Sequence, residues 1–403
     1  MNKETLWTKN FISVSASNFF LFVVFYFLLV TMPVYALQRL GGNATEAGLL
    51  TTFFLISAII IRPFAGQWIE QFGRKTILIS SQVIFLGASL LYFLPDTFGM
   101  MLVIRFIHGI GFGMATTAAG AMVAEIIPGS RRGEGMGYFV MSTNLAMVIG
   151  PFLGLTAMRQ WGSSVMFMIC IAISALALIS GLLVNAAEHK HTARALSIFQ
   201  VKFNPKDLFE FSALPIAVVG AFFSVAYASI LSFVSVYAEE IHVGEAASYF
   251  FIVYAIVLLL SRPFTGKWFD RYGANVIIYP AIFLFAAGLL LLSQTGTAIV
   301  FLIAAGIIGL GWGTLFPSFQ TIAIQEASPQ KKALATATFL SVFDLGIGLG
   351  SFIIGWAVTG MSFSMLYVYC AVYVLVGLFV YSLLHGRQAK KKHQMEKGEH
   401  QVV

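Results

Sequence analysis

Three ionisable residues lie inside long apolar runs of this 403-residue chain. Arg105 and His108 are three positions apart, so on a helix their side chains share one face. Asp344 lies inside a later segment, FDLGIGLG. A charge at the centre of a membrane helix costs at least about 2.5–3.5 kcal/mol, and such residues usually face protein or water and mark ion or proton pathways. The three residues are therefore candidates for proton coupling or for contact with a substrate.

Each candidate also has a structural explanation. The long side chain of Arg105 could reach the membrane surface with its charged end. A single membrane histidine such as His108 often serves only as a hydrogen-bonding group, and Asp344 could be paired permanently to hold its helix against a neighbour. The glycines that follow Asp344 favour such close helix contact. The sequence leaves these alternatives open.

The composition indicates that membrane helices position these residues. The chain is 59% hydrophobic and 10% charged, with a mean hydropathy of +0.87, outside the range of soluble proteins. A run of about 20 apolar residues crosses a hydrocarbon core of about 30 Å. We therefore expect an all-α polytopic membrane protein with twelve transmembrane helices. Their expected ranges are 11–37, 47–69, 76–95, 98–127, 135–158, 163–185, 211–237, 247–268, 274–293, 297–324, 333–358 and 364–385.

An internal repeat divides these helices into two groups of six. Residues 62–73 read RPFAGQWIEQFG and residues 262–273 read RPFTGKWFDRYG, an offset of 200 positions. Six crossings separate the two copies, so both face the same side of the membrane, as in parallel repeats. The sequence predicts two parallel six-helix pseudo-repeats. The expected parts are an N-terminal half (1–185), a cytoplasmic linker (186–210), a C-terminal half (211–385) and a basic cytoplasmic tail (386–403).

The repeat provides an internal comparison between architecture and chemistry. Glycines of one half recur in the other and let helices approach closely; they are Gly109, Gly111, Gly113 and Gly150, matched by Gly309, Gly311, Gly313 and Gly350. Arg105, by contrast, corresponds to Ala305, His108 to Ile308, and Asn144 to Asp344. We therefore expect the residues that differ between the halves, Asn144 included, to serve coupling or substrate binding.

The basic residues predict the orientation. With a cytoplasmic N-terminus, 21 of the 24 Lys and Arg residues fall on the cytoplasmic side, and only Arg39 and Arg159 fall outside. This is the positive-inside distribution, so we expect a multi-pass protein of the cell membrane with both termini cytoplasmic. The net charge of +7 then reflects topology and not nucleic-acid binding. The first apolar run is too long for a cleaved signal peptide and is expected to remain as a helix.

Several functions are excluded by absent motifs. The sequence contains no GxxxxGK[ST] phosphate loop, and its longest polar stretch is too short for a nucleotide-binding domain. Motifs of the HExxH and GxSxG kinds are also absent, which argues against an enzyme. Cys170 and Cys370 lie in apolar runs, so neither a disulfide, a metal site nor a cofactor is expected. Secondary transport remains.

Three motifs resemble signatures of the major facilitator superfamily. GQWIEQFGRK (66–75), with a degenerate partner at 266–273, is similar to the loop signature between helices 2 and 3. RFIHGIGFG (105–113) resembles the helix-4 signature, and GPFLG (150–154) resembles the helix-5 signature associated with proton-coupled exporters. Two positions depart from the pattern, because Glu70 stands where Asp is more common and Leu155 where a second Gly is common.

The resemblance implies a proton-coupled exporter of the 12-helix antiporter type. Its expected partners are a small amphipathic substrate, protons and the lipid bilayer, and it would act as a monomer by alternating access. A proton symporter for a nutrient, an exporter of one metabolite such as a metal-chelating compound and, remotely, a non-transporting receptor or enzyme are the alternatives.

The resemblance also assigns site residues. Loop charges and glycines would control the conformational change, with Glu125 as a further member of the set: Gly66, Glu70, Gly73, Arg74, Arg132, Glu134, Gly266, Asp270, Arg271 and Gly273. The helix-5 motif contributes Gly150, Pro151 and Gly154. A cavity near the membrane midplane is expected between the halves, with candidate wall residues Asn18, Tyr26, Tyr227, Tyr254, Phe316 and Gln320.

Overall fold

A computed structural model describes residues 5–95, 97–128, 131–185, 209–328 and 331–386. These residues form helices and no β-strand, which confirms the all-α class. The first part contains α1 (Lys9–Arg39), α2 (Ala44–Phe72), α3 (Arg74–Leu91), α4 (Phe98–Ile126) and α5 (Arg132–Leu182). The second contains the short 3-10 helix η2 (Phe211–Ala213), α7 (Leu214–Glu240), α8 (Ala246–Tyr272), α9 (Ala274–Ser293), α10 (Ala298–Gln325), α11 (Lys332–Ala357), α12 (Phe363–Tyr381) and the π-helical turn η3 (Ser382–Gly386).

The helices have the length and composition of membrane spans. Among the described residues, ten helices are long and apolar enough to cross a membrane, and α8 contributes a shorter apolar segment, Ala246–Arg262. The predicted ranges 135–158 and 163–185 fall within the single long element α5. This element is interrupted at Gly162, whose φ of 81° and ψ of 177° are not helical. Gly162 thus connects two spans within α5. Counted in this way, the helices agree with twelve transmembrane helices in two repeats.

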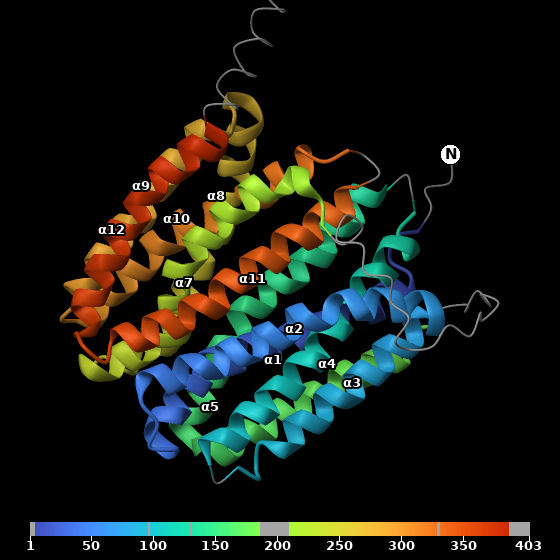
Figure 1. Ribbon diagram of the computed structural model, residues 1–403, viewed down its shortest axis with the longest axis horizontal. Helices are drawn as coiled ribbons and strands as arrows, with labels where there is room; N and C mark the ends of the chain where they lie inside the picture. The colour runs from blue at the N-terminus through green and yellow to red at the C-terminus, as the bar shows by residue number, and fades with distance from the viewer. Residues whose placement is uncertain (1–4, 96, 129–130, 186–208, 329–330, 387–403) are drawn as a thin grey trace, which may run out of the picture. The chain divides into compact units, whose positions relative to one another are not determined.

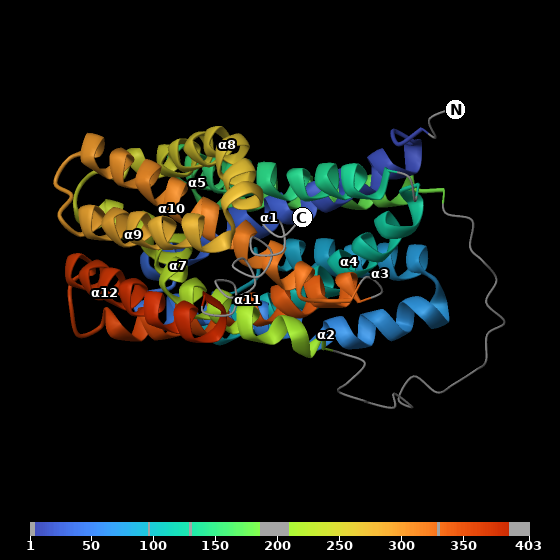
Figure 2. The ribbon, with the colours of Figure 1, turned by 90° about the horizontal axis from the view of Figure 1, so that it is seen from above.

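The chain forms two compact units, Met1–Phe203 and Asn204–Val403. Within the first unit, α1 packs along α5, α2 against α4, and α3 against both α4 and α5. Within the second unit, α7 packs along α11, α8 against α10, and α9 against α10 and α12 (Figures 1 and 2). Each unit therefore uses the same set of helix contacts. The predicted linker, 186–210, lies outside the described residues except for its last two positions.

Repeated glycines set the helix crossings in both units. A Cβ atom on Gly111 would lie 2.8 Å from the backbone nitrogen of Phe85, and one on Gly311 would lie 2.8 Å from the Cα of Phe285. Both pairs of residues are related by the 200-residue offset. Real Cβ atoms do not approach backbone so closely, so each glycine allows a backbone contact that any side chain would prevent.

Gly73 and Gly273 have a different requirement, which is conformational. Each joins two helices as a single residue, with φ of 85° and ψ of 150° or 165°. This backbone region is essentially restricted to glycine, and another residue there costs roughly 1–3 kcal/mol. We expect Gly273→Ala to lower the thermal unfolding temperature of the purified protein. The matched control is Gly266→Ala, since nothing lies within 4 Å of a Cβ at that helical position; equal destabilisation by both changes would contradict the explanation.

Candidate functional site

Arg105 is fully buried in the first unit. Its Nε donates to the Leu50 carbonyl oxygen of α2 at 3.1 Å, and its Nη1 donates to the Tyr92 hydroxyl at 3.3 Å. The guanidinium carbon lies 4.4 Å from the centre of the Phe54 ring, in cation–π range. Its third nitrogen, Nη2, has no hydrogen-bond partner among the described residues. A carbonyl, a hydroxyl and an aromatic face thus surround a permanent positive charge.

A chain of buried polar groups continues from Arg105 through the same unit. The Tyr92 hydroxyl lies 2.8 Å from His108 Nδ1, and Ser89 Oγ lies 3.4 Å from His108 Nε2. Ser89 Oγ is also 3.0 Å from Ser174 Oγ on α5. The structure therefore brings Arg105 and His108 together through a third residue. We refer to Arg105, Tyr92, His108, Ser89 and Ser174 as the buried polar chain.

Sequence reasoning missed Tyr92, Ser89 and Ser174, although the repeat carries a signal for them. The positions 200 residues later are Leu292, Leu289 and Val374, and those matching Arg105 and His108 are Ala305 and Ile308. All five positions of the buried polar chain are therefore apolar in the second unit. Comparison of the two halves at every position, and not only at charged ones, would have found them.

Asp344 and Asn144 occupy equivalent, half-buried places in the two units. Asp344 lies on α11 next to Phe343, whose carbonyl accepts a hydrogen bond from Ser224 of α7 at 3.1 Å. Asn144 lies on α5 next to Thr143, whose Oγ1 accepts a hydrogen bond from Asn18 of α1 at 3.1 Å. Each residue is thus at the crossing of the first and fifth helix of its unit. Asp344 belongs to the second unit, whereas Arg105 and His108 belong to the first.

The helix-5 motif lies along the contact between α1 and α5. A Cβ on Gly150 would be 2.7 Å from the Val23 carbonyl oxygen, and one on Gly154 would be 2.9 Å from Thr31 Cγ2. Pro151 stands inside the helix between these two contacts. In the second unit, a Cβ on Gly350 would be 2.7 Å from the Cα of Val225 on α7. Close helix packing thus accounts for the glycines of this motif.

The candidate wall residues divide between the units. Asn18 is buried and Tyr26 is half-buried in the first unit. In the second, the buried Tyr227 ring stacks on Trp312 at 4.4 Å between centres, and Tyr254 follows at 6.4 Å. The Phe316 ring lies 4.8 Å from the Phe343 ring between centres, and Phe343 directly precedes Asp344 in sequence. Gln320 is half-buried on α10. Aromatic rings thus pack on Phe343, the residue directly before Asp344.

The loop residues are described only in part. Arg74, at the start of α3, forms an ion pair with Glu125, near the end of α4. Both side chains are exposed, with 43% and 51% of their surface accessible, and an exposed pair contributes about 0–1 kcal/mol. Gly66 and Gly266 have no close neighbours for an added Cβ, and Arg271 is exposed. The side chains of Glu70, Arg132, Glu134 and Asp270 lie outside the described residues.

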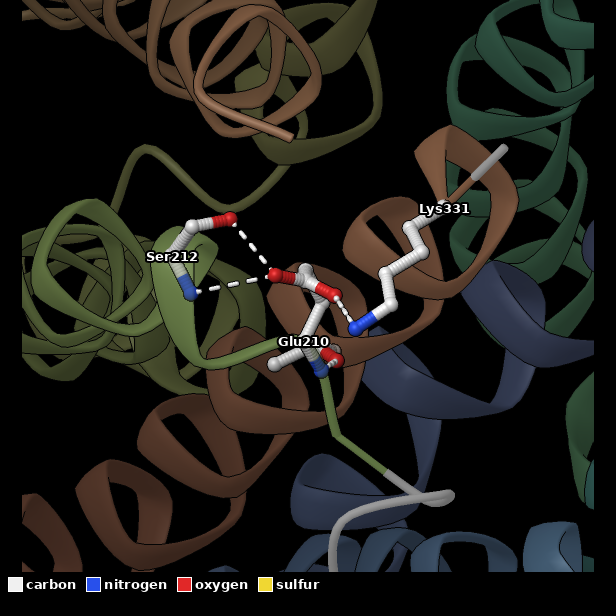
Figure 3. A network of polar contacts seen from close by, with 4 residues as sticks. Glu210, Ser212 and Lys331 are labelled. Atoms are coloured by element: carbon white, nitrogen blue, oxygen red, sulfur yellow. Dashed lines mark hydrogen bonds and ion pairs between the residues drawn. The ribbon is translucent and has the colours of Figure 1, made fainter. Parts of the chain in front are cut away.

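A polar cluster that the sequence did not reveal marks the beginning of the second unit (Figure 3). Glu210 Oε2 lies 3.1 Å from Lys331 Nζ, and Glu210 Oε1 accepts a hydrogen bond from Ser212 Oγ at 2.8 Å. The backbone nitrogen of Glu210 donates to Thr338 Oγ1 of α11 at 2.9 Å. Glu210 therefore ties the start of α7 to the start of α11. The Ser212 hydroxyl, followed by Lys331, lowers the pKa of the Glu210 carboxyl.

This lowered pKa predicts a pH dependence of stability. The carboxylate stabilises the fold above its unfolded pKa of about 4.5, and this contribution is lost as the pH falls through the lower folded pKa. We expect Glu210→Gln to lower the unfolding temperature near neutral pH and to approach the wild type at acid pH. The same change at the exposed Glu326, Glu326→Gln, is the control. A difference in unfolding temperature between Glu210→Gln and wild type that does not change with pH would contradict the prediction.

Comparison with known proteins agrees with these features. The family model of the Major Facilitator Superfamily matches residues 14–351, so the chain belongs to this superfamily. An uncharacterized MFS-type transporter of Methanocaldococcus jannaschii is 25% identical over 365 residues, which cover 88% of this chain and 93% of that protein. Membership makes the chain a multi-pass membrane transporter of small molecules and not an enzyme.

Two relatives from Staphylococcus aureus have more specific names. The staphylopine export protein is 24% identical over 358 residues, covering 84% of this chain and 86% of that protein. The quinolone resistance protein NorA is 27% identical over 136 residues, which cover only 34% of this chain and 35% of NorA.

Solved structures share the fold. A mutant of the nucleoside transporter NupG has a TM-score of 0.76 at 15% identity and covers 93% of this chain and 99% of its own. A bacterial homolog of the human lysosomal transporter Spinster has a TM-score of 0.73 at 15% identity and covers 97% of this chain and 99% of its own. At such identities the likeness concerns the fold alone.

Proposed function

We propose that this protein exports small amphipathic molecules in exchange for protons by alternating access, as a monomer in the cell membrane with both termini cytoplasmic. The observation that carries the proposal is the broken symmetry of the ionisable residues. Arg105 and Asp344 lie inside spans, while their counterparts are the uncharged Ala305 and Asn144. The second unit forms the same set of helix contacts as the first, with alanine instead of arginine at position 305. The architecture alone therefore does not require Arg105. A costly intramembrane charge without an architectural need favours a role in transport.

Asp344 is the proposed proton carrier. It is half-buried, and its neighbour in sequence, Phe343, packs with Phe316 and Trp312. A carboxylate in this position can exchange a proton while an apolar substrate part contacts the neighbouring rings. Exchange requires that proton and substrate each lower the affinity for the other, a coupling that is reciprocal.

The loop residues are proposed to bias the conformational equilibrium. Arg74 and Glu125 already form an ion pair between α3 and α4. Contacts of this kind that exist in one conformation and break in the other shift the population by their difference in free energy. We assign the same role to the loop charges Glu70, Arg132, Glu134, Asp270 and Arg271.

The export direction is supported by the relatives, two of which are named for export or drug resistance. A second candidate is export of one dedicated metabolite of the metal-chelating kind, because the staphylopine export protein matches this chain over most of its length. The two candidates differ in substrate range and share the coupling mechanism.

Proteoliposomes with an imposed pH gradient test the proposal. We expect the purified protein to move an amphipathic cationic dye against its concentration gradient, and to do so only while the pH gradient exists. A panel of chemically different compounds, tested in cells with and without the gene, separates broad export from export of one metabolite. Transport that ignores the pH gradient, or uptake coupled to proton entry in the same direction, would overturn the proposal.

A further inference from the structure

The hydroxyl group of Tyr92 lies between Arg105 and His108 and has one hydrogen to donate. Tyr92 follows the last residue of α3 and is fully buried. Its oxygen is 3.3 Å from Arg105 Nη1 and 2.8 Å from His108 Nδ1. A guanidinium only donates hydrogen bonds, so the hydroxyl accepts from Arg105. Its own hydrogen points to His108 Nδ1, its other partner among the described residues. His108 Nδ1 is therefore an acceptor.

The remaining groups of the buried polar chain agree with this direction. A neutral imidazole has one N–H group, and with Nδ1 accepting, the hydrogen is on Nε2, which lies 3.4 Å from Ser89 Oγ. Ser89 can donate to the Phe85 carbonyl at 2.9 Å or to Ser174 at 3.0 Å. Ser174 in turn donates to the Cys170 carbonyl at 2.8 Å. Every hydroxyl hydrogen of the buried polar chain thus has an acceptor. From Tyr92 onward, each group can donate to the next one along, in the direction away from Arg105.

A protonated His108 does not fit this arrangement. Its Nδ1 would carry a hydrogen and could no longer accept, so the Tyr92 hydrogen would lose its acceptor among the described residues. The rings of Phe54 and Phe85 cover the imidazole at 5.6 Å and 4.0 Å between centres. The titratable groups that face it are Arg105 and Tyr92, and none of the described contacts supplies a carboxylate.

We infer that Tyr92 is a positioning residue, whose hydroxyl orients the Arg105 guanidinium and holds His108 as the neutral tautomer with its hydrogen on Nε2. His108 then serves as a hydrogen-bond partner within the unit and not as the carrier of the transported proton. The effect on transport rests on the proposed function, whereas the tautomer is independent of it.

Nitrogen-15 NMR of the full-length protein in lipid nanodiscs, labelled at histidine, tests the tautomer directly. A His108→Gln sample identifies the resonances of His108 by their absence. We expect an unprotonated Nδ1 and a protonated Nε2 between about pH 5 and 8, the range in which histidines ordinarily titrate. In Tyr92→Phe, we expect the Nδ1 resonance to shift. A wild-type His108 with a protonated Nδ1, or one that becomes an imidazolium in this range, would overturn the inference.

Transport by matched variants tests the positioning role. Tyr92→Phe should lower the transport rate at least about tenfold, the effect of losing a hydrogen bond to a charged group. Tyr367→Phe is the control, because Tyr367 is equally buried and its hydroxyl donates to the Ser229 carbonyl, an uncharged group. His108→Asn should still concentrate substrate against a gradient.

Normal transport by Tyr92→Phe would overturn the positioning role, and a folded His108→Asn that exchanges substrate but cannot concentrate it would make His108 the proton carrier. If Tyr92→Phe does not fold, the wild-type NMR measurement still decides the tautomer. If the wild-type protein shows no proton-driven transport, the proposed function fails while the tautomer result remains valid.

Discussion

Replacing Arg105 by alanine is expected to abolish gradient-driven transport and to leave a folded, membrane-inserted protein. The second unit forms the same helix contacts with alanine at the equivalent position 305, so the fold tolerates a small apolar residue here. The change removes a buried positive charge together with its hydrogen bonds to Leu50 and Tyr92. Arg105→Lys should restore little activity, because a compact ammonium lacks the planar fork that reaches both acceptors.

The measurement combines transport in proteoliposomes with size-exclusion chromatography of the same samples. Arg39→Ala is the control, since Arg39 belongs to the same unit and is exposed at the end of α1. It should transport at the wild-type rate. Normal transport by Arg105→Ala, or full rescue by lysine, would remove the guanidinium from the mechanism.

Asp344→Asn is expected to uncouple transport from the proton gradient. Asparagine keeps the shape and much of the hydrogen bonding of aspartate but cannot release a proton. The variant should bind substrate and exchange it down a concentration gradient, yet it should not concentrate substrate when a pH gradient is applied. Gradient-driven uptake and passive counterflow, measured in the same vesicles, show the two properties separately.

Two further variants separate coupling from a structural role of Asp344. If the carboxylate only anchored α11 to a neighbour, Asp344→Asn would work almost normally or lose folded protein, and Asp344→Ala would be the worse of the two. Glu245→Gln makes the same chemical change at an exposed residue of the same unit and should leave coupling unchanged. Intact gradient-driven transport by Asp344→Asn would exclude this residue as the proton carrier.

Much of the fold could be predicted because the apolar runs are long and the repeat is regular. The expected range 274–293 coincides with α9, Ala274–Ser293. The expected range 76–95, in contrast, extends beyond α3, which ends at Leu91. Phe93 and Leu94 continue the apolar run but belong to the turn before α4. Hydropathy measures how apolar a segment is, and it does not distinguish the last helical turn from an apolar connection.

The candidate site could be predicted where a residue type is unusual for a membrane helix, and comparison of the halves at every position would have added further members. Arg105, His108 and Asp344 were found because charge is rare in such segments. Tyr92, Ser89 and Ser174 are ordinary residues there, and their hydrogen bonds run to other helices. Tyr92 and Ser89 pair with His108 of α4, and Ser89 pairs with Ser174 of α5. The pairing of Glu210 with Lys331 was missed for the same reason, since 121 positions separate the two residues. Such contacts depend on packing, which one sequence without a fold does not contain.

The restriction of the buried polar chain to one unit has a consequence for ancestry. A single gene for a six-helix protein that assembled in identical pairs would place the same arginine in both copies, and the cost of burying a guanidinium would be incurred twice. Once the two copies are joined in one polypeptide, each can mutate alone. In this chain, Ala305 and Ile308 stand where the other copy has Arg105 and His108. A repeat joined in one polypeptide thus allows one half to carry a buried charge that the other half lacks.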